Sequence, residues 1–219
     1  MRINTPMEQL RQAFPHKFPL YFVLMVNANF SYELFPDSSV SIPERPDVQK
    51  FGRFIKPHLH DRVLDIGIGP LPLPGYFSNP KGFQLIGLDP VAMPWSHVIE
   101  ACAEFMPFED EYFDAIIYAT SFDHLCDTAT ALRETYRVLK PNGQVLLWMS
   151  DNSHLQPQSG IVEIRGVPFV VPPGAVDPFH MTQESAAHVV GKFDFAGFKL
   201  EDFRDKPKTE TFMRFGKKK

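Results

Sequence analysis

The chain has 219 residues and a mass of 25.0 kDa, which suits one domain with a substantial core. Its formal net charge is −4 and its basic run is confined to Lys217–Lys219, so we expect no nucleic-acid partner. Cys102 and Cys126 lack metal-ligand spacing, which favours a cytoplasmic location over a disulfide-built secreted fold, and the apolar run Phe18–Val26 is too short to predict a membrane partner.

The first 50 residues are predicted to form a separate segment. Met7–Phe14 can make a short helix before Pro15, and turn-forming residues dominate after it, as in Phe35–Ser39 and Ile42–Pro46. We expect residues 1–50 to act as a lid over a substrate and residues 51–219 to form the main domain.

From residue 48 onward, strands and helices alternate. Apolar spacing predicts a helix that ends at Pro57 and a second helix over Thr128–Leu139, followed by a turn at Pro141–Gly143. Four short apolar runs predict strands: Arg62–Ile66, Gln84–Asp89, Ala115–Tyr118 and Gln144–Met149. This alternation predicts an α/β fold with a Rossmann-like doubly wound sheet, mostly parallel.

The regular alternation of strands and helices ends after Asp151. A hairpin insertion is predicted near residues 160–173, and Thr182 is predicted to cap a helix that runs to Phe193. Two last strands are expected at Lys199–Phe203 and Thr209–Phe215, and the sheet is expected to contain an antiparallel C-terminal strand.

A glycine loop and two carboxylates indicate a cofactor site. Gly67 and Gly69 follow the first strand and allow a ligand to approach the backbone. Asp89 ends the next strand, 24 residues after Asp65 (89 minus 65), where it can accept hydrogen bonds from ribose hydroxyls. A nicotinamide site is disfavoured because prolines at 70, 72 and 74 leave few amides for a pyrophosphate.

The motifs resemble those of the class I S-adenosylmethionine-dependent methyltransferases, especially the small-molecule branch. Four blocks match in order: Val63–Gly69, Leu88–Pro90, Ala103–Phe108 with Phe113–Asp114, and Leu132–Glu134 through Arg137–Gly143. Together they cover roughly residues 48–150.

The resemblance implies S-adenosylmethionine as cofactor, with S-adenosylhomocysteine as product. It implies that the methionine end is lined by Asp65, Gly67 and Gly69, the ribose is held by Asp89 beside Pro90, the adenine is flanked by Ala103 and Glu104, and the sulfonium lies near the backbone of Ala119 and Thr120. Two positions depart from the family pattern: Leu71 stands where a third glycine is common, and Cys102 stands where an aspartate is common.

Catalytic candidates follow the third strand. If the acceptor is a hydroxyl, a base must take its proton. His124 is the first candidate base, Asp123 is its orienter or the second candidate, and His180 could reach the same cleft. Each histidine could instead serve a structural role.

Magnesium is the less favoured alternative. Asp123, Asp151 and Asn152 offer oxygen ligands at a spacing that resembles metal-dependent catechol O-methyltransferases. The lysine that follows the first aspartate in that family is absent here. The metal ligands are therefore left open.

The sequence thus predicts a methyltransferase that acts on an oxygen or a nitrogen of a small-molecule acceptor. The alternative is a non-catalytic S-adenosylmethionine-binding or scaffold protein of the same fold. The sequence does not define the acceptor, the general base or the oligomeric state.

Overall fold

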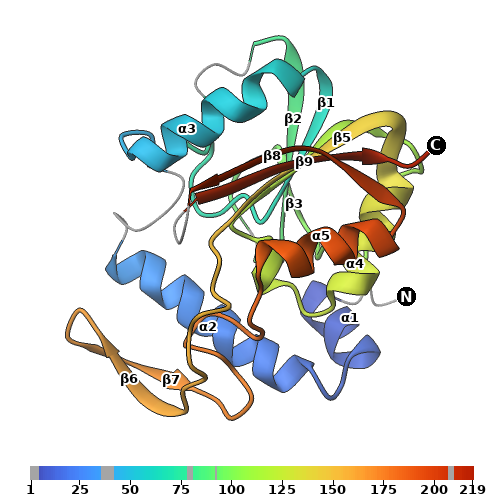
Figure 1. Cartoon of the computed structure of the whole chain (residues 1–219). Coiled ribbons are helices and arrows are strands. Elements are labelled where there is room, and N and C mark those ends of the chain that lie inside the picture. Colours follow the sequence, from blue (N-terminus) through green and yellow to red (C-terminus); the bar gives the residue numbers. More distant parts are fainter. Residues whose placement is uncertain (1–4, 36–41, 78–80, 92, 207–209) are drawn as a thin grey trace.

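The computed structural model describes residues 5–35, 42–77, 81–91, 93–206 and 210–219. The helices are α1 (Pro6–Ala13), α2 (Phe18–Leu34), α3 (Pro46–Ile55), α4 (Thr128–Val138) and α5 (Ala186–Phe195), with 3-10 turns η2 (Lys56–His58) and η3 (Phe122–His124). The strands are β1 (Asp61–Ile66), β2 (Phe83–Asp89), β3 (Val98–Glu100), β4 (Phe113–Ala119), β5 (Leu139–Met149), β6 (Gly160–Ile164), β7 (Val167–Val171), β8 (Phe198–Lys206) and β9 (Glu210–Lys217). Figure 1 shows their arrangement.

Seven strands form one sheet in the order β3-β2-β1-β4-β5-β9-β8. The pairs from β3 to β5 are parallel, whereas β9 runs antiparallel to both of its neighbours. This confirms the predicted mostly parallel sheet with an antiparallel C-terminal strand. The strand order reverses between β1 and β4, so the carboxyl ends of these strands are where a doubly wound protein binds its ligand.

Alternate residues of the central strands pack into two hydrophobic cores, one on each face of the sheet. Val63 of β1 packs with α3 on one face, and Leu64 packs with α4 and α5 on the other. The same alternation continues in β4, where Ile117 faces α3 and Ile116 faces α4 and α5. Burial of both faces explains why these strands read as continuous apolar runs.

Two local predictions differ from the structure, and the segment after the glycine loop lacks regular structure. The helix near residue 182 begins later, because Ser185 rather than Thr182 caps it by accepting the His188 amide. Pro141–Gly143 lies within β5, where a shift in the pairing with β4 absorbs the extra residues in place of a turn. Residues 70–77 form no helix, because three closely spaced prolines remove amide donors.

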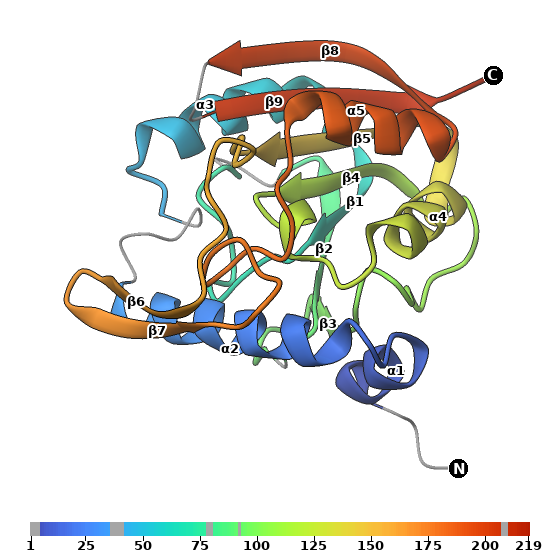
Figure 2. The same ribbon diagram turned by 60° about the horizontal axis from the view of Figure 1, so that its bottom comes forward.

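The N-terminal residues form two helices where the sequence predicted one. Thr5 caps α1 in a reciprocal bond pair with Glu8. Figure 2 shows α2 lying across the carboxyl-end side of the sheet, with the β6-β7 hairpin alongside it. The Asn27 side-chain amide joins them by donating to the Val170 carbonyl at 2.7 Å. Within the described ranges, no helix is long and apolar enough to cross a membrane.

Candidate functional site

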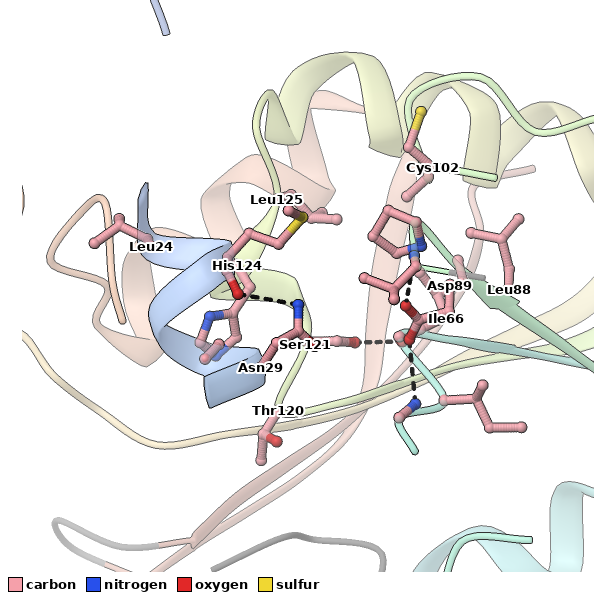
Figure 3. A pocket seen from close by; sticks show the side chains of 18 of the residues that line it. Leu24, Asn29, Ile66, Leu88, Asp89, Cys102, Thr120, Ser121, His124 and Leu125 are labelled. Carbon is pink, nitrogen blue, oxygen red and sulfur yellow. Dashed lines mark hydrogen bonds between the residues drawn. The ribbon is translucent and has the colours of Figure 1, made fainter. Parts of the chain in front are cut away.

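A pocket opens at the carboxyl ends of β1, β2 and β4, and α2 forms its outer wall. It encloses about 1000 Å³, part of which is open to solvent. Figure 3 shows Asn29 and His124 on one side of this pocket and Asp89 and Cys102 on the other. The location at the carboxyl ends of these strands suits a nucleoside-containing cofactor.

The loop after β1 depends on glycine. Gly67 and Gly69 have φ angles of 71° and 79°, in the left-handed region. A Cβ on Gly67 would lie 2.7 Å from the Ser121 Cβ, and the Ser121 hydroxyl donates to the Ile66 carbonyl at 2.5 Å. Gly67 therefore allows the loops after β1 and β4 to meet at the pocket wall, which both glycines line.

Asp89 ends β2 as a buried carboxylate that lines the pocket beside Pro90. It accepts the Gly69 amide at 3.2 Å and the Val91 amide at 3.0 Å. Burial raises the pKa of Asp89, although the two backbone hydrogen bonds oppose this increase. Each carboxylate oxygen retains a lone pair with which it can accept a ligand hydroxyl.

Asp65 lies deeper than the sequence predicted. It is fully buried and is not among the pocket-lining residues. The Tyr76 hydroxyl donates to its Oδ2 at 2.7 Å, whereas Oδ1 has no hydrogen-bond partner among the described residues. Burial raises the pKa of Asp65 to about 7, and the bond from Tyr76 limits the rise.

Two further segments of the pocket wall contain residues that the sequence predicted to contact the cofactor. Ala103 and Glu104 line the pocket next to Cys102, and Ala119 and Thr120 line it at the end of β4. The Glu104 carboxylate accepts the Asp127 amide at 2.9 Å, and burial raises the pKa of Glu104. The side chain of Glu104 therefore also holds the start of α4 against the pocket wall.

The structure brings the three predicted catalytic residues together. Asp123 and His124 lie in η3, and the His180 Nε2 is 3.3 Å from the Asp123 Oδ2. The His180 Nδ1 is 2.8 Å from the Asp177 Oδ2. Burial opposes protonation of His180, but its bonds to the two carboxylates outweigh this and raise its pKa to about 10.

His124 differs from its neighbours because it lines the pocket, with 33% of its side chain exposed. Burial of the ring lowers the pKa of His124, which favours the neutral imidazole. Asp123 and His180 do not line the pocket, although Phe179 and Met181 on either side of His180 do. His124 is thus the member of this cluster that can reach a ligand directly.

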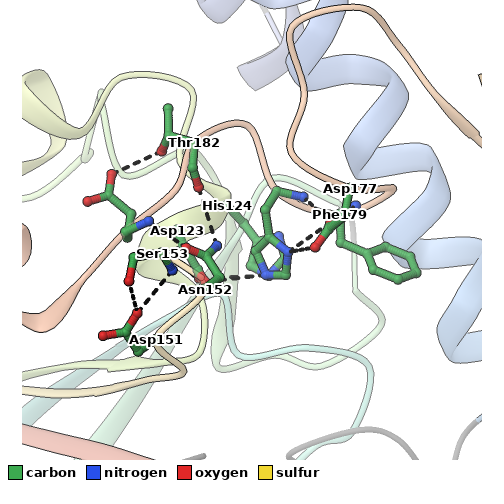
Figure 4. A network of polar contacts seen from close by, with 10 residues as sticks. Asp123, His124, Asp151, Asn152, Ser153, Asp177, Phe179 and Thr182 are labelled. Carbon is green, nitrogen blue, oxygen red and sulfur yellow. Dashed lines mark hydrogen bonds and ion pairs between the residues drawn. The ribbon is translucent and has the colours of Figure 1, made fainter. Parts of the chain in front are cut away.

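Two of the three candidate magnesium ligands, Asp151 and Asn152, already have hydrogen-bond partners. Asp151 accepts hydrogen bonds from the amide and hydroxyl of Ser153, at 3.0 Å and 2.5 Å. Asn152 is bonded through its side chain to the Thr182 carbonyl and the Glu184 amide. Figure 4 shows the Asp151 side chain directed toward Ser153 and away from His124.

Sequence reasoning missed the contributions of Tyr76, Asp177 and α2. Tyr76 contacts Asp65, and Asp177 contacts His180. No local sequence motif predicts these contacts. The pocket-lining residues of α2 recur at helical spacing: Tyr21, Leu24, Met25, Ala28, Asn29 and Tyr32. That spacing is hidden in the sequence, because residues on the opposite side of α2, such as Phe22 and Phe30, are also apolar.

The parallel sheet, the glycine loop and the carboxylate at the end of β2 define a doubly wound protein with a site for a nucleoside-containing cofactor. A family model described as "Methyltransferase domain" matches residues 64–147. The ubiquinone/menaquinone biosynthesis C-methyltransferase of Proteus mirabilis is 31% identical over 113 residues, covering 52% of this chain and 40% of that protein. Its counterpart from Vibrio parahaemolyticus is 29% identical over 167 residues, covering 68% and 60%.

Solved structures show the same fold. A Burkholderia thailandensis 1,6-didemethyltoxoflavin-N1-methyltransferase, with 1,6-didemethyltoxoflavin and S-adenosylhomocysteine bound, has a TM-score of 0.66 at 15% identity, covering 100% of this chain and 93% of that chain. A Pyrococcus horikoshii protein has a TM-score of 0.61 at 18% identity, covering 86% and 99%.

Residues 64–147 therefore contain a methyltransferase domain, and the resemblance of the motifs to the class I S-adenosylmethionine-dependent methyltransferases is confirmed. The chain spans about half the length of the curated relatives it matches.

Proposed function

We propose that the protein transfers the methyl group of S-adenosylmethionine to a hydroxylated small molecule. The observation that carries the proposal is the position of His124, which lines the same pocket as Gly67 and Asp89. A group able to handle a proton thus stands beside the place where the family's cofactor presents its methyl group. The acceptor atom is the hydroxyl oxygen or a ring carbon activated by that hydroxyl.

The pocket walls support this orientation of the cofactor. Asp89 can accept the ribose hydroxyls, and the wall at Ala103 and Glu104 is the adenine end. The methionine end then lies at Gly67 and Gly69, above the buried carboxylate of Asp65. In this orientation the sulfonium faces the backbone at the end of β4.

The N-terminal segment, residues 1–50, supports a lid role because α2 supplies one wall of the pocket. Its contribution is largely apolar, with Leu24, Met25 and Ala28 facing the ligand space beside Tyr32. Burial raises the pKa of Tyr32, so its hydroxyl remains a neutral donor or acceptor. An apolar wall with isolated polar groups suits an aromatic acceptor and excludes water from the reacting methyl group.

The reaction moves one methyl group and one proton. The C–S bond of the sulfonium breaks with its electron pair left on sulfur, and a bond forms from carbon to the acceptor oxygen or ring carbon. The acceptor loses a proton, for which the cluster at His124 is the nearest recipient among the predicted groups. Correct positioning of the two ligands supplies much of the rate.

The candidate acceptor atoms include carbon as well as the oxygen or nitrogen predicted from the sequence. The two curated relatives described above are C-methyltransferases by name, which adds carbon to the acceptor atoms to be tested. A cytoplasmic location remains in keeping with Cys102 and Cys126, which are both free thiols.

The test is turnover with methyl-labelled S-adenosylmethionine and pooled metabolites, with NMR of the labelled product to distinguish O-, N- and C-methylation. We expect a labelled aromatic product from the wild-type protein and far less from Asp89→Ala. A protein that binds the cofactor but labels no acceptor would instead be the non-catalytic cofactor-binding protein.

A further inference from the structure

Four side chains from two segments meet behind the wall of the pocket. Asp123 and His124 come from η3, and Asp177 and His180 come from the segment before α5. Asp123 stands at the centre, with its Oδ2 3.3 Å from the His180 Nε2 and its Oδ1 3.9 Å from the His124 Nε2. Figure 4 shows Asp123, His124 and Asp177 as members of one network of polar contacts.

One atom at this centre lacks a partner. The Asp123 side chain is only 7% exposed, and its Oδ1 has no hydrogen bond within the part of the chain that the structure describes. A buried carboxylate oxygen without a hydrogen-bond partner lowers the stability of the fold, and a bound cation or a hydrogen-bond donor would remove this cost. The Nε2 of His124, a second potential ligand, lies 3.9 Å from Oδ1.

Both imidazoles are held from outside the cluster. The His180 Nδ1 contacts the Asp177 carboxylate at 2.8 Å and 2.9 Å, and the ring of His124 is hydrogen-bonded to the backbone of Phe179. Histidines that bind metals typically donate their second ring nitrogen to a carboxylate or a backbone carbonyl, which fixes the ring orientation. The outer contacts of His180 follow this pattern directly.

We propose that Asp123, His124 and His180 form a binding site for one divalent transition-metal ion. Their three ligand atoms lie within 4.8 Å of one another. Ligand atoms around tetrahedral zinc are separated by about 3.3 Å, so small side-chain rotations complete the geometry. Two imidazoles with one carboxylate favour zinc or iron over magnesium, which prefers oxygen ligands.

Two other acidic groupings are poorer sites. In the oxygen set of Asp123, Asp151 and Asn152, the last two are already bonded to Ser153 and to backbone groups. The second described group of suitable ligands, His60 with Asp61 and Asp114, is largely exposed. Its Asp114 is already paired with Lys140 at 2.7 Å.

The ion would lie where it can act on the acceptor. Three protein ligands leave coordination positions open, and His124 brings one edge of the site to the pocket. A bound acceptor hydroxyl would lose its proton to water more easily because the ion stabilises the oxyanion, and His124 would then serve as a ligand instead of a base. This catalytic role rests on the proposed function, whereas metal binding itself does not.

The test begins with protein freed of metal by a chelator and then titrated with Zn²⁺ in a calorimeter, with Co²⁺ absorption as a second readout. We expect one Zn²⁺ per chain. His180→Ala should weaken binding at least 100-fold, and Asp177→Asn about 10- to 100-fold because it removes an outer contact. His60→Ala is the matched control and should leave Zn²⁺ binding unchanged.

Binding of S-adenosylhomocysteine by each variant shows that its fold is intact and separates this proposal from the proposed function. A His180→Ala variant that binds S-adenosylhomocysteine but not Zn²⁺ supports the site. The proposal is wrong if Zn²⁺ does not bind, or if His124→Ala and His180→Ala leave its affinity unchanged. Mg²⁺ binding that is lost in Asp151→Ala would also overturn it, in favour of the oxygen set.

Discussion

Asp65 is a carboxylate with no exposed surface and one hydrogen bond, from the Tyr76 hydroxyl. Its pKa is raised by burial from 3.8 to about 7, so the folded chain holds a proton that the unfolded chain releases between these values. By linkage, this group lowers the stability of the cofactor-free fold progressively as the pH rises from about 4 to about 7. The destabilisation of the fold by Asp65 is greatest once its carboxyl group is ionised.

We predict that Tyr76→Phe destabilises the cofactor-free protein more at pH 8 than at pH 6. At pH 8 the variant must either bury an unpaired Asp65 anion or bind a proton, and such a buried unsatisfied group costs about 1–3 kcal/mol. At pH 6 Asp65 is already protonated in the wild-type protein. Urea unfolding at the two pH values measures the difference, and equal losses would show that Asp65 does not titrate in this range.

Asp89 provides the second prediction at this scale. Asp89→Ala should weaken binding of S-adenosylhomocysteine about 10- to 100-fold, because a hydrogen bond to a charged acceptor contributes about 1.5–3 kcal/mol. Calorimetry measures the affinity. Glu100→Ala is the matched control, since Glu100 pairs with Asp89 in the sheet register but is exposed and outside the pocket. Equal affinities for the two variants would place the ribose elsewhere.

Residues that belong to local motifs could be predicted from the sequence. Gly67, Gly69 and Asp89 end apolar runs, so their place at the carboxyl edge follows from the alternation of strands and helices. The hydrogen bond of Asp65 to Tyr76 could not be predicted, because it depends on how the proline-rich segment after β1 folds back.

Among the elements, α2 carries the largest difference between expectation and structure. It is apolar on both sides, so its sequence lacks the alternation of polar and apolar faces that announces a surface helix. One side lines the pocket, whereas Phe22, Val26 and Phe30 on the other are each more than 40% exposed. A short apolar run of this kind does not distinguish helix from strand without the tertiary contacts.

Strand positions were predictable because burial on both faces leaves recognisable apolar runs, as in β1 and β4. The short strand β3 was missed, since Val98–Glu100 is mostly exposed and joins the sheet only through pairing with β2. The turn predicted at Pro141–Gly143 was wrong because the pairing of β4 with β5 continues past it.

The attachment of α2 gives a prediction at the element scale. The Asn27 amide donates to the Val170 and Pro178 carbonyls at 2.7 Å and 2.9 Å, joining α2 to the hairpin and to the segment that carries His180. We expect Asn27→Ala to cost about 1–3 kcal/mol, because two largely buried acceptors lose their donor. Urea unfolding and amide exchange should show faster opening of α2 and β7.

The control for this change is Asn29→Ala on the same helix. Among the described residues, the Asn29 amide donates within α2, to the Met25 carbonyl. We therefore expect little change in the opening of the hairpin. Equal exchange rates in the two variants would mean that apolar packing, rather than Asn27, holds α2 against the hairpin.

At the scale of the whole molecule, the cofactor is expected to join parts that are distant in the sequence. The pocket wall combines α2 with the ends of β1, β2 and β4, so a cofactor bound there would contact both α2 and the sheet. A ligand that binds only the folded state adds about 2.7 kcal/mol of stability when its concentration is 100 times its dissociation constant. The change in thermal stability on adding a ligand therefore reports whether the protein binds that ligand.

The most direct test is the melting temperature of the wild-type protein with S-adenosylhomocysteine, compared with NAD and with no ligand. At about 100 times the dissociation constant, S-adenosylhomocysteine should raise the melting temperature by roughly 5 to 10 °C for a chain of this size, and NAD should leave it unchanged. A folded protein that shows no shift with millimolar S-adenosylhomocysteine, or a shift with NAD alone, would contradict the assignment of the pocket.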